Sequence, residues 1–221
     1  AYEVDPSAGK TMVRGQITLR GPAPPVERVA VLRDSVFCGE VVTSEALLVD
    51  RSSSGIAAVV VSLEGVAKGK ALPDERDERQ AALDNRACRF SPHVKAVPTG
   101  STLEISNADQ VLHNTHIRKS GDTFLNVALP PGGKTIRKPL IAVGRLDVRC
   151  DAHRFMQATI HVFDHPYFAV TDAAGQFELT QVPPGVYRLR VWHETLGMRE
   201  KSVTVPAAGR TVVNLELENP N

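Results

Sequence analysis

The sequence predicts an all-β protein built from β-sandwiches. Apolar and polar residues alternate over short stretches, and turns rich in glycine and proline separate those stretches. Almost no apolar stripe follows the 3.6-residue period of a helix. The 221 residues include 16 glycines and 15 prolines, and 42% are hydrophobic. The chain can therefore bury a core in one large domain or in two small ones.

The N-terminal third contains several strand patterns. "MVRGQITL" sets Val13 and Leu19 among polar neighbours and ends at the proline-rich residues 22–25. "EALLVD" and "GIAAVVVSLEGV" follow, and the second is the nearly continuous apolar run of a strand buried on both faces. The polar, alanine-rich stretch after it predicts a loop with a short helix at about residues 74–84.

The middle of the chain continues the period of two. "FSPHVKAVP" leads into the turn "PTGS", and "TLEISN" places Leu103 and Ile105 on one face. After the turn cluster "ALPPGGKT", the stretch "GRLDVRC" places Leu146, Val148 and Cys150 on one face. "ATIHVF" alternates in the same way, so these stretches predict the facing strands of a sandwich.

The C-terminal part contains "TDAAGQFELTQVPPGVYRLRVWH". This stretch resembles the carboxypeptidase-regulatory, transthyretin-like type of β-sandwich module, and the resemblance covers about residues 168–219. The turns "DAAG" and "VPPG" would close its hairpins. Such a module usually begins with "G-x-I/V" and "G-A-x-V" strands, and these do not directly precede residue 168. The resemblance implies an inward face of Phe177, Leu179, Tyr187, Leu189 and Val191.

Charge and hydropathy exclude some classes of partner. The formal net charge is +1, which gives no argument for binding nucleic acid or an anionic membrane. No apolar run approaches the roughly 20 residues that span a bilayer. The chain opens on "AYEV" without a methionine, and a small first residue is what cleavage of a signal peptide leaves. We therefore expect an exported, periplasmic protein.

Cysteine usage points the same way. An odd number of cysteines in an exported protein predicts one pair and one thiol with another role. Cys150 has metal-binding neighbours, so Cys38 and Cys88 form the expected disulfide. Closing that long loop would stabilise the fold by roughly 4 kcal/mol. The alternative is three buried, reduced cysteines in a cytosolic protein.

A cluster of soft donors lies in "CDAHRFM", residues 150–156, which we call the ligand loop. Cys150, His153 and Met156 are spaced three residues apart, and they can converge only if the chain turns tightly after Cys150. A thiolate, an imidazole and a weak thioether suit copper better than a hard cation. Zinc would instead require another cysteine, histidine or carboxylate.

Copper bound in this way needs a second imidazole from a neighbouring strand. "NADQVLHNTHI" provides His113, which continues the face of Leu103 and Ile105, whereas His116 has the opposite parity. We therefore select His113. The amide of Asn114 is expected to hydrogen-bond across the site to the ligand loop or to the Cys150 sulfur.

"NADQVLHNTHI" followed by "CDAHRFM" closely resembles the cupredoxins, the type 1 copper proteins, and their spacing is most similar to that of amicyanin-like members. The resemblance covers roughly residues 88–163. It implies a cupredoxin Greek-key β-sandwich that binds one copper ion per chain, cycling between Cu⁺ and Cu²⁺ and transferring single electrons between redox protein partners. The implied ligands are His113, Cys150, His153 and Met156.

Two residues depart from the family pattern. Leu112 and Arg154 stand where many members have proline. Neither change removes a ligand. Arg154 places a cation beside His153, whose edge usually reaches solvent in this family. This predicts either a redox partner with an acidic docking face or a raised reduction potential.

The expected boundaries are an N-terminal β segment at 1–70, the cupredoxin-like copper domain at 71–165 and the carboxypeptidase-regulatory-like module at 166–221. The N-terminal strands have the character of the module's missing first strands. They would therefore pack with the C-terminal module, leaving the copper domain between them. Alternatively, they complete the cupredoxin sandwich.

The remaining histidines are expected to be hydrogen-bonded or solvated, although a second metal site among His93, His116, His165 and His193 is the alternative. No G-x-S-x-G or H-E-x-x-H motif occurs, so we expect an electron carrier and not an enzyme. The competing hypotheses are a protein that stores or delivers copper, and a periplasmic interaction module with a structural metal.

Overall fold

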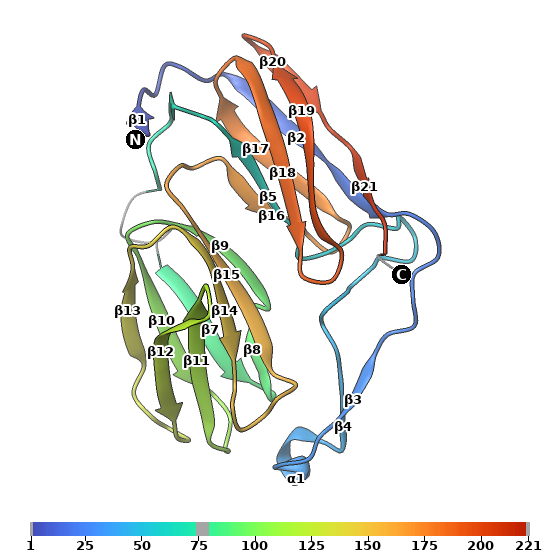
Figure 1. The fold of residues 1–221 in the computed structure, drawn as a ribbon, viewed down its shortest axis with the longest axis vertical. Coiled ribbons are helices and arrows are strands. Elements are labelled where there is room, and N and C mark those ends of the chain that lie inside the picture. The colour runs from blue at the N-terminus through green and yellow to red at the C-terminus, as the bar shows by residue number, and fades with distance from the viewer. Residues whose placement is uncertain (1, 74–79, 220–221) are drawn as a thin grey trace. The chain divides into compact units, whose positions relative to one another are not determined.

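The computed structural model describes residues 2–73 and 80–219, and it divides the chain into two compact units. The outer unit consists of residues 1–25, 46–73 and 164–221, and the inserted unit consists of residues 26–45 and 74–163. Strands make up nearly all the regular structure of the described residues, and their one helix is the four-residue α1. The predicted all-β class is confirmed (Figure 1).

The outer unit contains two four-stranded sheets and a short parallel pair, β1 with β6. One sheet has the order β16-β5-β18-β19, and the other contains β17-β2-β20, with β21 also pairing to β2. The strands are β1 (Glu3–Val4), β2 (Thr11–Leu19), β5 (Val60–Glu64), β6 (Lys68–Gly69), β16 (Phe168–Val170), β17 (Gln176–Val182), β18 (Gly185–His193), β19 (Gly197–Val205), β20 (Gly209–Val212) and β21 (Leu215–Leu217).

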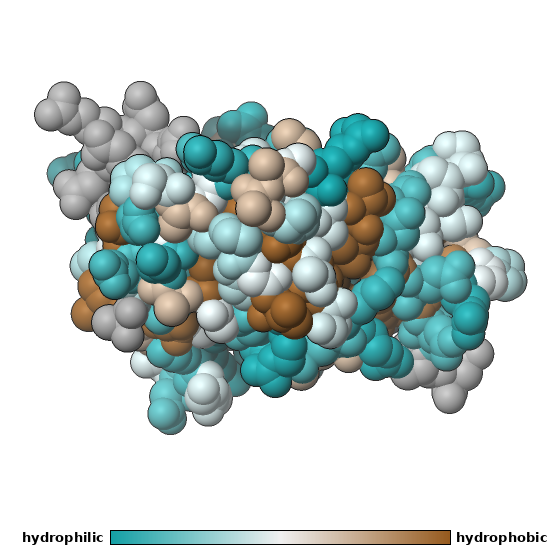
Figure 2. Space-filling view, turned by 90° about the horizontal axis from the view of Figure 1, so that it is seen from above, coloured by the Kyte–Doolittle hydropathy of each residue, from teal (hydrophilic) through white to brown (hydrophobic). Residues whose placement is uncertain are grey.

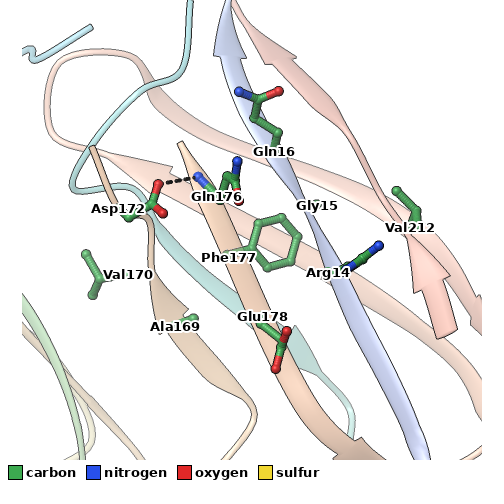
Figure 3. Close-up of a pocket in the computed structure, with 10 residues that line it drawn as sticks. All are labelled: Arg14, Gly15, Gln16, Ala169, Val170, Asp172, Gln176, Phe177, Glu178 and Val212. Carbon is green, nitrogen blue, oxygen red and sulfur yellow. Dashed lines mark hydrogen bonds between the residues drawn. The ribbon is translucent and has the colours of Figure 1, made fainter. Parts of the chain in front are cut away.

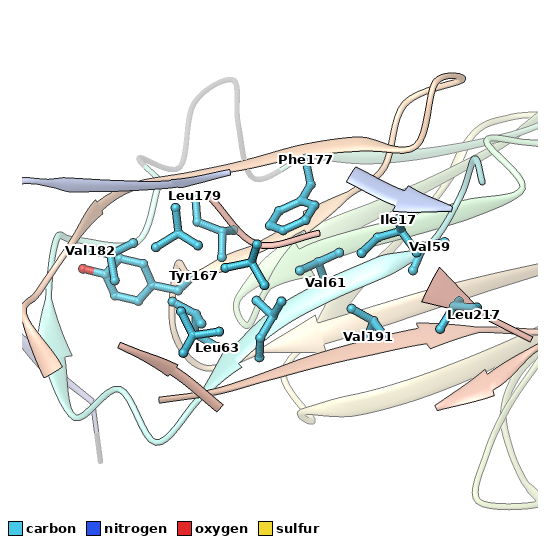
Figure 4. Packing of buried hydrophobic residues seen from close by; sticks show 14 of the residues in the cluster. Ile17, Val59, Val61, Leu63, Tyr167, Phe177, Leu179, Val182, Val191 and Leu217 are labelled. Atoms are coloured by element: carbon cyan, nitrogen blue, oxygen red, sulfur yellow. The ribbon is translucent and has the colours of Figure 1, made fainter. Parts of the chain in front are cut away.

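N-terminal strands complete the outer unit. β2 pairs with β17, with Val13 opposite Leu179, and β5 pairs with β18, with Leu63 opposite Leu189. These four side chains are buried in one core, together with Phe177 and neighbours from both sheets. Figure 4 shows Leu63, Leu179 and Phe177 in this core. The apolar run in β5 is continuous because the central strand of this sheet has buried residues on both faces.

The inserted unit also contains two main sheets. Their orders are β13-β10-β7-β8 and β12-β11-β14-β15-β9, and β3 pairs with β4 separately. The elements are β3 (Arg28–Ala30), α1 (Ser35–Cys38), β4 (Val41–Thr43), β7 (Gln80–Arg86), β8 (Arg89–Ser91), β9 (Val94–Pro98), β10 (Ser101–Asn107), β11 (His113–Lys119), β12 (Asp122–Leu129), β13 (Ile136–Leu140), β14 (Gly144–Arg149) and β15 (Gln157–Phe163).

The helix expected at about residues 74–84 is wrong over its described part. Residues 80–84 belong to strand β7, which pairs in parallel with β10, and residues 74–79 lie outside the described residues. Ala81 and Leu83 point into the core beside Leu103 and Ile105. This burial at every second residue stabilises a strand, although alanine and glutamine favour helices locally.

Residues 26–45, which we call the arm, pack with the inserted unit, although the sequence boundaries counted them within the N-terminal segment. The arm consists of β3, α1 and β4. The expected disulfide between Cys38 and Cys88 is confirmed, with Cα atoms 5.6 Å apart, and it joins the arm to the loop between β7 and β8. An ion pair of 3.4 Å between Arg89 and Glu45 adds a second attachment.

The surface seen in Figure 2 carries mostly hydrophilic side chains, with smaller hydrophobic areas between them. In the part of the chain that the structure describes, no helix has the length and apolar content needed to span a bilayer.

Candidate metal centre

The sheet of the inserted unit brings the predicted donor residues together. β11 begins at His113, and β14 ends directly before Cys150. The two strands run antiparallel, with His116 opposite Arg149. The start of β11 therefore lies beside the ligand loop, although the two segments are separated by more than thirty residues in sequence.

The ligand loop makes the tight turn that the spacing requires. The Met156 N–H donates to the carbonyl of His153 at 2.9 Å, and the Cys150 N–H donates to the carbonyl of Met156 at 3.3 Å. These two bonds fold the loop back on itself, so that Nδ1 of His153 lies 3.7 Å from the Cys150 sulfur. The loop thus presents its thiol and its imidazole on the same side.

Three buried donor atoms converge at this point. Donor atoms of His113, Cys150 and His153 all lie within 4.8 Å of one another. The two imidazoles face each other through their Nδ1 atoms, which are 3.1 Å apart. Met156 is 2% exposed and belongs to the same hydrophobic core as Cys150, and the role of its thioether stays a prediction.

A carboxylate contacts each imidazole at Nε2, the ring nitrogen that points away from the other donor atoms. Nε2 of His113 lies 2.9 Å from Oδ2 of Asp109, and Nε2 of His153 lies 3.0 Å from Oδ2 of Asp34. A carboxylate accepts a hydrogen bond, so each Nε2 carries the ring proton and each Nδ1 presents a lone pair. Two lone pairs and a thiol then point into one buried space, a donor set suited to a soft cation.

Asp109 is itself fixed by the loop between β7 and β8. It is 4% exposed, and its two carboxylate oxygens accept the backbone N–H groups of Ala87 at 2.7 Å and Cys88 at 2.8 Å. Burial lowers the pKa of His113 below its ordinary value, and the hydrogen bond to Asp109 only partly opposes this effect. His113 is therefore neutral near pH 7, which is the form that binds metals.

The prediction for Asn114 is confirmed. Its Oδ1 accepts the backbone N–H groups of Asp151 at 2.6 Å and Ala152 at 3.3 Å, and it lies 3.4 Å from the Cys150 sulfur. Its own backbone N–H points to that sulfur at 3.5 Å. One asparagine thus joins β11 to the ligand loop and sets the position of the thiol.

His116 lies on the other face of β11, as its parity predicts, and it supports the loop from outside the donor cluster. Its Nδ1 lies 3.2 Å from the Asp151 carboxylate, and its Nε2 lies 2.9 Å from the Thr123 hydroxyl. Burial acts to raise the pKa of the Asp151 carboxyl, but hydrogen bonds from His116 and Asn114 outweigh this effect. The pKa of Asp151 is therefore lowered.

Sequence reasoning missed the two carboxylates. Asp109 had a local signal, because it precedes His113 by four residues in the same motif. Asp34 had none, since it lies 119 residues before His153 and in a segment assigned to another part of the chain.

The other histidines do not join a metal cluster in the ranges that the structure describes. His165 accepts the backbone N–H of Tyr167 at 3.1 Å, and His193 accepts that of Thr195 at 3.2 Å, so both close turns in the outer unit. A second group, formed by Cys88, Asp109 and His113, shares the site already described. Cys88 is not a free ligand there because it is disulfide-bonded.

A separate cavity of about 630 Å³ opens on the outer unit beside β2 and β17 (Figure 3). Its carboxylate from Asp172 accepts the backbone N–H of Gln176 at 2.8 Å and that of Ala174 at 2.9 Å. Asp172 therefore closes the turn before β17.

Comparisons with known proteins return both families that the sequence resembles. The family model of the carboxypeptidase regulatory-like domain matches residues 151–218. A comparison with curated proteins finds no match. Solved structures that are similar to this chain include cupredoxins and a copper enzyme.

A purple cupredoxin from Nitrosopumilus maritimus is 22% identical with a TM-score of 0.33, and the match covers 37% of this chain and 98% of that protein. Amicyanin from Paracoccus versutus is 16% identical with a TM-score of 0.35, covering 42% of this chain and 95% of amicyanin. A copper-containing nitrite reductase from Thermus scotoductus is 21% identical with a TM-score of 0.36, covering 44% of this chain. The chain spans only 24% of that reductase.

Proposed function

We propose that this chain is a periplasmic type 1 copper protein that carries single electrons between redox partners. The proposed ligands are His113, Cys150, His153 and Met156, with one copper ion per chain. Bound copper would supply one-electron redox chemistry at this site.

The observation that supports this proposal best is the pair of opposed imidazoles. Their Nδ1 atoms are 3.1 Å apart, while each Nε2 lies within 3.0 Å of a carboxylate. Two lone pairs at that separation repel each other unless a cation or a proton lies between them. The Cys150 thiol within 4.8 Å makes a three-donor site, for which a soft metal ion is the better occupant.

The chain's own residues define what the site can do. Cys150 would bind as the thiolate, and the Asn114 N–H would donate to that sulfur and stabilise its negative charge. Asp109 and Asp34 fix the two imidazoles in the tautomer that leaves Nδ1 free. Donors held this firmly change little in position when a metal's charge changes, and such rigidity favours electron transfer.

The covalent chemistry supports the proposed compartment. The disulfide between Cys38 and Cys88 fits an exported protein, because cytosolic thiols are kept reduced. This supports the proposed periplasmic location. The edge of His153 is buried and not open to solvent as the resemblance implied, but Arg154 beside it is exposed, and this cation favours a partner with an acidic docking face.

The test is to titrate metal-free protein with Cu(II), to record the visible spectrum and then to measure the reduction potential by voltammetry. An intense thiolate-to-copper band and a reversible one-electron wave are expected. A colourless protein that binds only Cu(I) would favour the hypothesis of copper storage or delivery. A protein that binds no copper would favour the hypothesis of an interaction module.

A further inference from the structure

The second imidazole of the site is covered by the arm. Oδ2 of Asp34 lies 3.0 Å from Nε2 of His153, and the side chain of His153 is 0% exposed. The side chain of Asp34 is 34% exposed, so its carboxylate stands between the imidazole and the solvent. The edge of His153 that points away from the other donors is therefore closed by a segment outside both main sheets.

The arm is attached close to that contact. Cys38 follows Asp34 by four residues and is bonded to Cys88, whose backbone N–H donates to Asp109. The far end of the arm is attached through the ion pair between Arg89 and Glu45. The disulfide thus limits how far Asp34 can move from the site.

The arm and the ligand loop also face each other along their length. Val29, Ala30, Leu32 and Arg33 of the arm line a cavity of about 320 Å³ together with residues 151–155. The carboxylate of Asp34 makes a polar contact across this boundary. Arm and loop are therefore separate surfaces joined by a specific hydrogen bond, and not one continuous core.

We propose that Asp34 is a positioning residue for His153 and that the disulfide-anchored arm is a cover that keeps solutes away from this imidazole. A charge-assisted hydrogen bond at Nε2 opposes rotation of the ring and fixes which nitrogen faces the other donors. The backbone of Asp34 has φ 56°, a left-handed conformation that aspartate and asparagine adopt more readily than most residues. The proposal rests on the proposed function only in treating His153 as a ligand.

The test measures access to His153 in metal-free protein with diethyl pyrocarbonate, which modifies accessible imidazoles, and locates the modification by mass spectrometry. His93, which is partly exposed, provides the internal reference. In the wild-type protein His153 should react much more slowly than His93. Asp34→Ala should raise the labelling rate of His153 by about tenfold, the order expected from losing one charged hydrogen bond.

Matched variants separate positioning from general disruption. Asp34→Asn keeps an oxygen that can accept from Nε2 and the same backbone preference, so it should restore most of the protection. Glu40→Ala removes an exposed carboxylate from the same arm and should leave the labelling of His153 unchanged.

The double variant Cys38→Ser/Cys88→Ser tests the anchor, after circular dichroism has shown that it remains folded. It should expose His153 even with Asp34 intact. The proposal is overturned if His153 reacts as fast as His93 in the wild-type protein, or if it stays protected in both Asp34→Ala and the double variant. The labelling experiment uses metal-free protein, so its outcome does not depend on copper binding. If Asp34→Ala loses protection but the wild-type protein binds no copper, the proposed function is overturned and the proposed cover is supported.

Discussion

The two imidazoles of the site are held in the same way by two different parts of the chain. Asp109, behind His113, is 4% exposed, comes from the same segment, and also accepts two backbone N–H groups. Asp34, behind His153, is 34% exposed and lies on an arm that a disulfide anchors. The first support lies in the loop between β10 and β11 and is fixed by backbone N–H groups, whereas the second lies on an arm outside both main sheets.

Because of this difference, we expect the two carboxylates to affect different properties: Asp109 the stability of the fold, and Asp34 the access of solutes to His153. Removing the support of His113 should damage the fold, because three donors lose one buried acceptor. Removing the support of His153 should mainly open the site.

Cys150→Ser should abolish the visible copper band completely, because serine does not supply the soft thiolate on which the charge transfer depends. Circular dichroism should show a folded chain, since serine is nearly isosteric with cysteine. Absorbance after addition of Cu(II) is the measurement. A band of undiminished intensity would show that this sulfur is not a ligand.

Asp109→Ala should lower the free energy of unfolding by about 4 kcal/mol, because Ala87 N–H, Cys88 N–H and the His113 ring lose their buried acceptor. Asp34→Ala should cost only about 1 kcal/mol, since that carboxylate is partly solvated and makes fewer bonds. Urea unfolding of both metal-free variants gives the comparison. Equal losses of unfolding free energy would remove the distinction between the buried support from Asp109 and the partly exposed support from Asp34.

His161, in β15, extends the comparison to an imidazole outside the donor cluster. Burial, and then the charge of Arg145, lower its pKa to about 4. As the pH falls below about 6.5, this imidazole becomes protonated in the unfolded chain but stays neutral in the folded chain until the pH approaches about 4. The stability present at neutral pH should therefore be lost progressively between about pH 6.5 and pH 4, by at most about 3 kcal/mol.

Unfolding free energies at pH 7 and pH 4, for the wild-type protein and for His161→Gln, measure this contribution. The variant cannot titrate at this position, so its stability should fall less over the same range. A parallel decline in both proteins would mean that burial at this position does not disfavour the charged ring.

Met156→Leu should have the smallest effect. Leucine fills a similar volume in the core, so the unfolding free energy should change by less than about 1.5 kcal/mol. The visible band should remain while the reduction potential shifts, because a weakly binding thioether would tune a bound metal without being needed to hold it. Voltammetry and absorbance together test this, and an unchanged potential would remove Met156 from the proposed ligand set.

The sequence by itself determined the features that depend on neighbours in the chain. Alternation with a period of two identified the strands that carry Leu103, Ile105, Leu146 and Val148, because a strand exposes its faces in that order. The spacing of the ligand loop and the parity of His113 selected residues that the fold then brings together. The odd cysteine count led to the disulfide.

Tertiary structure alone decided the features that depend on distant pairings. Residues 80–84 form a strand because β10 provides a parallel neighbour, which local propensity cannot reveal. The strands β2 and β5 complete a module whose other strands follow residue 164, because hydrogen-bonding partners are chosen in space and not along the chain. The contact between Asp34 and His153 could not be predicted for the same reason. Nothing in the sequence around Asp34 indicates its partner, and only the fold and the disulfide bring the two residues together.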